Sequence, residues 1–132
     1  MVMKRAPAER RQAERAGRYA EFAALAWLVC TGHRLLARRH KAAGGEIDLV
    51  VRRGRMIIFC EVKYRRPTGH EGIPSPMQQK RICNAAREFM ARNHISPYLE
   101  CRFDLIRISP FTWRDSLPIR HLRDACGVIP PK

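Results

Sequence analysis

Acidic residues and a lysine stand close together in the middle of the chain. Asp48 lies in the run Gly45–Val50 (GEIDLV), and Glu61 and Lys63 lie in the run Phe59–Lys63 (FCEVK). Side chains alternate between the two faces of a strand, so Glu61 and Lys63 would point the same way. If a hairpin pairs the two runs, Asp48 would face the same place. Two neighbouring carboxylates bind Mg²⁺ or Mn²⁺, because hard cations prefer oxygen ligands.

These residue types suit the hydrolysis of a phosphodiester. A divalent cation held by Asp48 and Glu61 polarises a phosphoryl oxygen and acidifies bound water, and Lys63 beside it would orient that water and offset charge. The alternative is that the three groups form cross-strand charge pairs on a solvated sheet face. The surrounding residues are apolar on both faces, which indicates covered central strands and favours the site.

A third acid precedes the strands. Glu21 lies three, four and seven residues before Ala24, Leu25 and Leu28, so it is expected on the inward face of a helix. A metal site would explain a carboxylate there. An ion pair with an arginine such as Arg18 at the edge of the apolar stripe explains it equally well.

The elements that would position these groups follow from composition and periodicity. We predict a helix over residues 9–31 capped at Gly32, strands over 34–40, 46–52 and 56–65 with a turn at Arg53-Gly54, and a mobile loop over 67–76. A helix over 77–93, with its apolar stripe at Ile82, Ala85, Ala86, Phe89 and Met90, a strand over 101–108 and a short strand over 117–122 follow. The order αβββαβ predicts an α/β fold, a central mixed sheet flanked by helices. We expect a disordered basic start (1–8), one domain (9–126) and a tail (127–132).

The charge of the chain favours a polyanionic partner. Its 132 residues hold 26 Lys and Arg against 12 Asp and Glu, a formal net charge of +14. Neutralising phosphates releases their counterions, so nucleic acid is the expected partner, although an anionic membrane or a ribosome would also attract this charge. Three basic clusters bracket the two predicted site strands and suit phosphate contacts, whereas most charge runs are merely solvated. They comprise Arg38, Arg39 and Lys41; Arg52, Arg53 and Arg55; and Arg65 and Arg66.

The remaining composition argues against several other classes. The hydrophobic content of 45% is ordinary for a globular protein, and the five cysteines stand singly, without zinc-type or disulfide-type spacing. The apolar run over residues 22–30 is too short to span a bilayer and lacks the flanks of a signal peptide. We therefore expect a cytoplasmic protein that does not enter the membrane, with its cysteines as small buried side chains.

Four segments together resemble a known family. They are Gly17-x-x-Ala20-Glu21, residues 44–49 (GGEIDL), residues 59–65 (FCEVKYR) and residues 102–105 (RFDL). In order and spacing they resemble the YraN-like family of small bacterial proteins, which is similar to archaeal Holliday junction resolvases and belongs to the PD-(D/E)XK, restriction-endonuclease-like superfamily. The resemblance implies a restriction-endonuclease-like core and extends from about Gly17 to Ile108.

The resemblance also implies roles for individual residues. Asp48, Glu61 and Lys63 would form the catalytic core, with Glu21 as the acid from the first helix. A glutamine on the second helix would complete the site, which points to Gln79, with Gln78 and Lys80 as neighbours. Glu46 is read as a helper that faces away from Asp48, and Arg102 with Asp104 as an internal ion pair. Resolvase-like proteins are often dimers, so a homodimer is a further expectation.

Two main hypotheses follow. The first is a Mg²⁺- or Mn²⁺-dependent endonuclease acting on structured or branched DNA. The second is a nucleic-acid-binding adaptor that kept the fold without turnover and binds DNA without metal. A weaker third reading is a ribosome- or RNA-associated protein.

Overall fold

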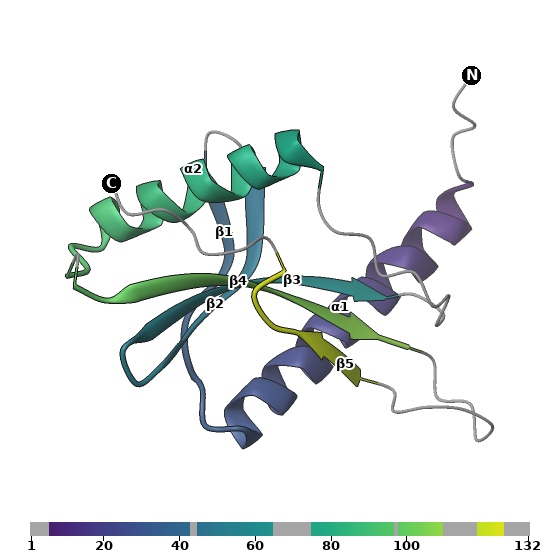
Figure 1. Cartoon of the computed structure of the whole chain (residues 1–132). Helices are drawn as coiled ribbons and strands as arrows, with labels where there is room; N and C mark the ends of the chain where they lie inside the picture. The colour runs from purple at the N-terminus through teal and green to yellow at the C-terminus, as the bar shows by residue number, and fades with distance from the viewer. Residues whose placement is uncertain (1–5, 43–44, 65–74, 97, 110–118, 126–132) are drawn as a thin grey trace.

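Two helices enclose a mixed five-stranded sheet (Figure 1). The computed structural model describes residues 6–42, 45–64, 75–96, 98–109 and 119–125. The sheet order is β1-β2-β3-β4-β5; β3 and β4 are parallel and the other neighbours are antiparallel. The elements are α1 (Pro7–Cys30), β1 (Arg34–Ala42), β2 (Gly45–Arg53), β3 (Met56–Tyr64), α2 (Pro76–Arg92), β4 (Glu100–Ile108) and β5 (Ile119–Leu122). The predicted α/β class, a mixed sheet flanked by helices, is confirmed.

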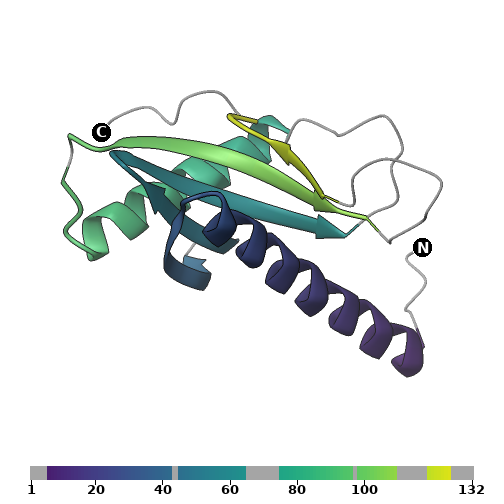
Figure 2. The same ribbon diagram turned by 90° about the horizontal axis from the view of Figure 1, so that it is seen from below.

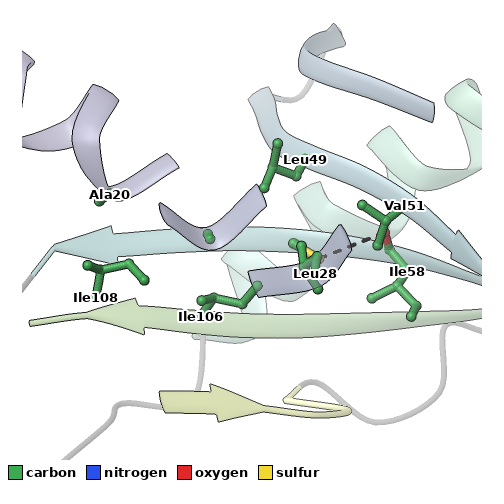
Figure 3. Packing of buried hydrophobic residues seen from close by; sticks show 9 residues of the cluster. Ala20, Leu28, Leu49, Val51, Ile58, Ile106 and Ile108 are labelled. Atoms are coloured by element: carbon green, nitrogen blue, oxygen red, sulfur yellow. Dashed lines mark hydrogen bonds between the residues drawn. The ribbon is translucent and has the colours of Figure 1, made fainter. Parts of the chain in front are cut away.

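The helices cover opposite faces of the sheet, as the two views show (Figures 1 and 2). One core joins Ala20, Ala24 and Leu28 of α1 to side chains of β2, β3 and β4 (Figure 3). The other joins Ala85, Ala86 and Phe89 of α2 to the opposite face. Burial on both faces explains why β2 and β3 have nearly continuous apolar sequences. The predicted stripe of the second helix is confirmed, with Ile82 and Met90 packed at its margin.

Helix α1 begins at Pro7, two residues earlier than predicted, and ends in a glycine cap as expected. Gly32 has φ +90°, and its N–H donates to the Val29 carbonyl at 3.1 Å, while His33 N–H donates to the Leu28 carbonyl at 2.9 Å. This is the Schellman arrangement, which satisfies carbonyls left open at the helix end. Neither helix in the described part of the chain is long and apolar enough to cross a membrane.

The hairpin of β2 and β3 sets the register of the acidic motifs. Its turn is Gly54-Arg55, one residue later than predicted, and Gly54 has φ +61°. A residue with positive φ suits a two-residue hairpin loop. The pairs run from Arg53 with Met56 to Leu49 with Cys60. Asp48 therefore lies one residue beyond the last pair of the ladder, on the side away from the turn.

Helix α2 begins inside the segment that was predicted to be a loop. Ser75 caps the helix, because its hydroxyl accepts from Gln78 N–H at 3.2 Å and its own N–H donates to the Gln78 side chain at 3.0 Å. Pro76 occupies the first helical position, where it lacks only a donor that has no partner in the helix. The rest of the predicted mobile loop, residues 67–74, lies outside the described residues.

An ion-pair network closes the other edge of the sheet. Arg102 donates to both carboxylate oxygens of Asp104 at 2.7 and 3.0 Å, and Asp104 is fully buried. His121 Nε2 of β5 lies 2.6 Å from the same carboxylate, and Trp27 of α1 donates to His121 Nδ1 at 3.4 Å. The expected internal ion pair is confirmed. Burial alone would raise the pKa of Asp104, but the hydrogen bonds from His121 and Arg102 hold it below its ordinary value.

Two smaller expectations change. Cys30 is exposed, whereas Cys60 is buried as predicted and Cys126 lies outside the described residues. Strand β1 extends to Ala42, two residues beyond the prediction. Neither change alters the architecture that positions the acidic residues.

Candidate active site

Asp48 lies where β2 separates from β3. Beyond the Leu49–Cys60 pair, its Oδ2 accepts a hydrogen bond from the Val62 N–H at 2.8 Å. A side chain thus takes the place of a backbone acceptor, which satisfies a strand N–H that the diverging partner no longer reaches. The carboxyl group of Asp48 is therefore fixed against β3, within two residues of both Glu61 and Lys63.

The Glu-x-Lys pair lies on one face of β3 as expected. Lys63 Nζ is 2.8 Å from Glu61 Oε1, and both side chains are partly exposed. A cavity of about 200 Å³ opens between this part of the sheet and α2. Asp48 and Glu61 both line it, so the structure brings these two predicted acids together.

The electrostatics of Asp48 reflect this environment. Its pKa is raised from an ordinary value of 3.8 to about 6, mainly by burial and further by the negative charges of Glu21 and Glu61. The Val62 N–H and the ammonium of Lys63 act in the opposite direction. A carboxyl group with a raised pKa among like charges is the kind of perturbed group that clusters at functional sites.

Glu21 is held by an arginine from another element. Its Oε2 lies 3.1 Å from Arg39 Nε, with 15% of the Glu21 side chain and 50% of the Arg39 side chain exposed. The alternative partner, Arg18, instead pairs with Glu14 at 3.9 Å. The inward position predicted for Glu21 is confirmed, and so is the arginine ion pair, but the arginine belongs to β1.

The carboxylates can be tested as ligands for the expected Mg²⁺ or Mn²⁺. Magnesium is commonly held by one or two carboxylates, with waters and substrate phosphate completing its shell. Asp48 and Glu61 supply such a pair, so the donor chemistry fits. In the described part of the chain, no third side-chain ligand is grouped with this pair. Among the described residues, no three His, Cys, Asp or Glu side chains are arranged to hold a metal ion.

The helix side of the cavity differs from the expectation. Gln78, Arg81, Ile82 and Ala85 line it, whereas Gln79 is half-buried and Lys80 exposed outside the lining. Sequence reasoning missed Arg81, although its position four residues before Ala85 of the apolar stripe is a usable signal, because residues four apart share a helix face.

The sheet side of the cavity also differs from the expectation. Glu46 lines it together with Asp48, so the expectation that Glu46 faces away is wrong. Residues two apart on a strand share a face, and this spacing applies to Glu46 and Asp48.

Only one of the three basic clusters adjoins the acids in the described residues. Arg38 and Lys41 are exposed on β1, opposite Leu49 and Glu46 of β2. Because β1 is an edge strand, these charges also discourage edge-to-edge pairing.

The second cluster lies at the far end of the hairpin. Arg52 donates to the Gly54 carbonyl at 2.8 Å, and Arg53 and Arg55 are exposed beside it. Arg55, in the turn just before β3, is six residues from Glu61 along an extended chain, on the order of 20 Å. This cluster lies at the end of the two site strands away from the acids, and its contact with nucleic acid stays a prediction. Arg65 and Arg66 lie outside the described residues.

Comparison with known proteins places the chain. Residues 20–108 match the family described as "Uncharacterised protein family UPF0102". A UPF0102 protein of Maricaulis maris is 47% identical over 106 residues, which cover 79% of this chain and 83% of the relative. One from Mesorhizobium japonicum is 38% identical over 119 residues (85% and 90%), and one from Methylorubrum extorquens is 41% identical over 112 residues (84% and 88%). The matched range 20–108 contains the positions of Glu21, Asp48, Glu61, Lys63 and the Arg102–Asp104 pair. The chain belongs to the UPF0102 family.

Proposed function

We propose that this protein is a metal-dependent endonuclease that hydrolyses phosphodiester bonds in structured or branched DNA. The observation that carries the proposal is the cavity beside α2, where Asp48 and Glu61 from adjoining strands line one wall and Lys63 pairs with Glu61. Two carboxylates, an adjacent ammonium and a strongly basic chain match what cleavage of a polyanion at a divalent cation needs.

Each residue has a role that its contacts allow. Asp48 and Glu61 would hold Mg²⁺ or Mn²⁺, and Glu21 would contribute from α1. When bound, the ion supplies a Lewis acid and an acidified water. Asp48 is oriented for this by its hydrogen bond from the Val62 N–H. Lys63 now pairs with Glu61. If Glu61 instead bound a cation, the ammonium of Lys63 would be left beside the site and could offset negative charge on the phosphate.

Arg38, Arg39 and Lys41 would contact the DNA backbone beside the site. They lie on β1 directly across β2 from the acidic residues, and all three are exposed. Exposed cations that flank a cleavage site position the duplex without reading its sequence. Gln79 and Lys80 of α2, Arg52, Arg53 and Arg55 of the hairpin, and Arg65 and Arg66 stay predictions for this function.

The mixed sheet supports a restriction-endonuclease-like core as the finer description of the fold. Three antiparallel strands place the acid and the Glu-x-Lys pair side by side, and α2 then returns the chain to a parallel β4. A homodimer and a cytoplasmic location also remain predictions; sedimentation equilibrium would measure the first.

The experiment that tests catalysis is cleavage of labelled four-way junctions, nicked duplex, single strands and intact duplex with Mg²⁺ or Mn²⁺. Asp48→Asn and Glu61→Gln keep the shapes of the side chains and remove the charges, and Lys63→Ala removes the ammonium. Glu14→Gln is the matched control, because it removes one carboxylate from an exposed pair on α1. We expect loss of cleavage in the first three variants and none in the control.

The second candidate is a nucleic-acid-binding adaptor without turnover. It is favoured by one observation, that no three ligand side chains among the described residues are gathered for a metal ion. Gel shifts in EDTA separate the candidates. Tight binding without cleavage in any metal, unchanged in Asp48→Asn and Glu61→Gln, would support the adaptor and overturn the nuclease.

A further inference from the structure

Arg39 has an unusual backbone for a residue inside a strand. Its φ is +49°, in the left-handed region that residues other than glycine rarely adopt. The ladder pairs on either side, Arg38 with Leu49 and His40 with Ile47, keep the same register. Arg39 therefore lies opposite Asp48, and its conformation is a local departure at the level of the candidate site. Strained residues that persist at such places are often part of a mechanism.

The side chain of Arg39 is committed to one acid. It leaves the sheet on the side of α1 and pairs with Glu21, whose side chain is only 15% exposed. Glu21 is near enough to Asp48 for its charge to act on that carboxyl group. The ion pair thus holds the Glu21 carboxylate against Arg39, and among the described residues Glu21 is not gathered with Asp48 and Glu61 as a third metal ligand.

Two of the three carboxylates around the site form ion pairs, and the third accepts a backbone hydrogen bond. Arg39 neutralises Glu21, Lys63 neutralises Glu61, and Asp48 receives a backbone N–H. A divalent cation that binds Asp48 and Glu61 would attract Glu21 and repel Arg39, because Arg39 lies opposite Asp48 in the ladder and the Glu21 charge already acts on the Asp48 carboxyl group.

We propose that Arg39 is a positioning residue that competes with the divalent cation for the carboxylate of Glu21. Glu21 then becomes a metal ligand only when its ion pair with Arg39 breaks. This inference rests on the proposed function in its use of a cation bound by Asp48 and Glu61. Arg39, released beside that cation, is left exposed on β1 among the side chains that would contact phosphate.

The test is Mn²⁺ binding to the DNA-free protein, followed by the loss of the free-ion signal in electron paramagnetic resonance. Arg39→Gln removes the charge, and Arg39→Gly removes the charge and also relieves the left-handed backbone, which guards against misfolding. We expect both variants to bind Mn²⁺ roughly three- to tenfold more tightly, the range for releasing one partly exposed ion pair and a nearby positive charge. Arg39→Lys should restore the wild-type affinity.

Two further proteins make the test specific. Arg92→Gln is the matched control, since Arg92 pairs with Glu88 at 3.1 Å on α2, and its affinity should match wild type. Combining Arg39→Gln with Glu21→Gln should abolish the gain. A gain that survives in this double variant, or no gain in either Arg39 single variant, overturns the inference.

The outcomes also separate this inference from the proposed function. Mn²⁺ binding that is lost in Asp48→Asn but indifferent to Arg39 overturns the role of Arg39 alone. No Mn²⁺ binding in any of the proteins overturns both.

Discussion

Replacing Asp48 by asparagine should make the protein more stable at alkaline pH and leave its stability unchanged in acid. The carboxyl group is half-buried, close to Glu61 and within reach of the charge of Glu21, and its pKa is raised from 3.8 to about 6. Ionising it in the folded protein is therefore harder than in the unfolded chain. Asparagine keeps an oxygen to accept the Val62 N–H without carrying the charge.

The sign and the size follow from the pKa. A folded-state pKa above the unfolded value favours the folded protein most below about pH 4, and this contribution is lost as the pH rises through 6. A shift of about two units corresponds to about 3 kcal/mol at most, and solvent screening of a half-buried group lowers the expected figure to about 2 kcal/mol. The melting temperature of Asp48→Asn should then exceed that of wild type by on the order of 5–10 °C at pH 8.

The assay is urea unfolding of both proteins, followed by circular dichroism, at half-unit steps from pH 4 to pH 8. Because the other acids are common to both proteins, their pH dependence cancels in the difference. The difference in free energy of unfolding should be near zero at pH 4 and grow mainly between pH 4 and 6. A difference that is flat with pH, or a variant less stable than wild type at pH 8, would refute the reasoning about Asp48.

Four other substitutions probe the scaffold, each by urea unfolding at pH 7. Asp104→Ala should cost roughly 3–5 kcal/mol, because it removes a fully buried carboxylate and leaves the partly buried Arg102 without its partner; a loss under 1 kcal/mol would contradict that role. Phe89→Ala should cost roughly 3–5 kcal/mol, because the ring is 3% exposed and packs edge-on against Phe59; a milder effect would mean that the α2 face can repack. Gly32→Ala should cost about 1 kcal/mol through its φ of +90° alone, since an added Cβ meets nothing closer than 3.8 Å, and Gly54→Ala at φ +61° provides the comparison.

The sequence alone carried most of the fold. Apolar periodicity and continuous β-branched runs predicted both long helices and β1–β4, because burial on one face of a helix or both faces of a strand leaves a pattern in the residue order. Element ends moved by one or two residues, as at Pro7 and Ser75, since capping by a proline or a serine hydroxyl extends a helix into what reads as a loop.

The same residue order also indicated which acids belong together. Glu61 and Lys63 share a face because strand side chains have a period of two, and a two-residue turn brings Asp48 beside them. The inward position of Glu21 followed from the helical period in the same way.

The partners of those acids were decided by tertiary structure. That Glu21 meets Arg39 and not Arg18 depends on how α1 crosses β1 and on a left-handed residue within a strand, neither of which has a local signature. Asp48 accepts from the Val62 N–H because of where β2 separates from β3. Gln78 and Arg81 line the cavity in place of Gln79 because of the rotation of α2 about its axis. Contacts between elements are set by the packing of whole faces, so the physical reason for each lies in side chains far away in the sequence.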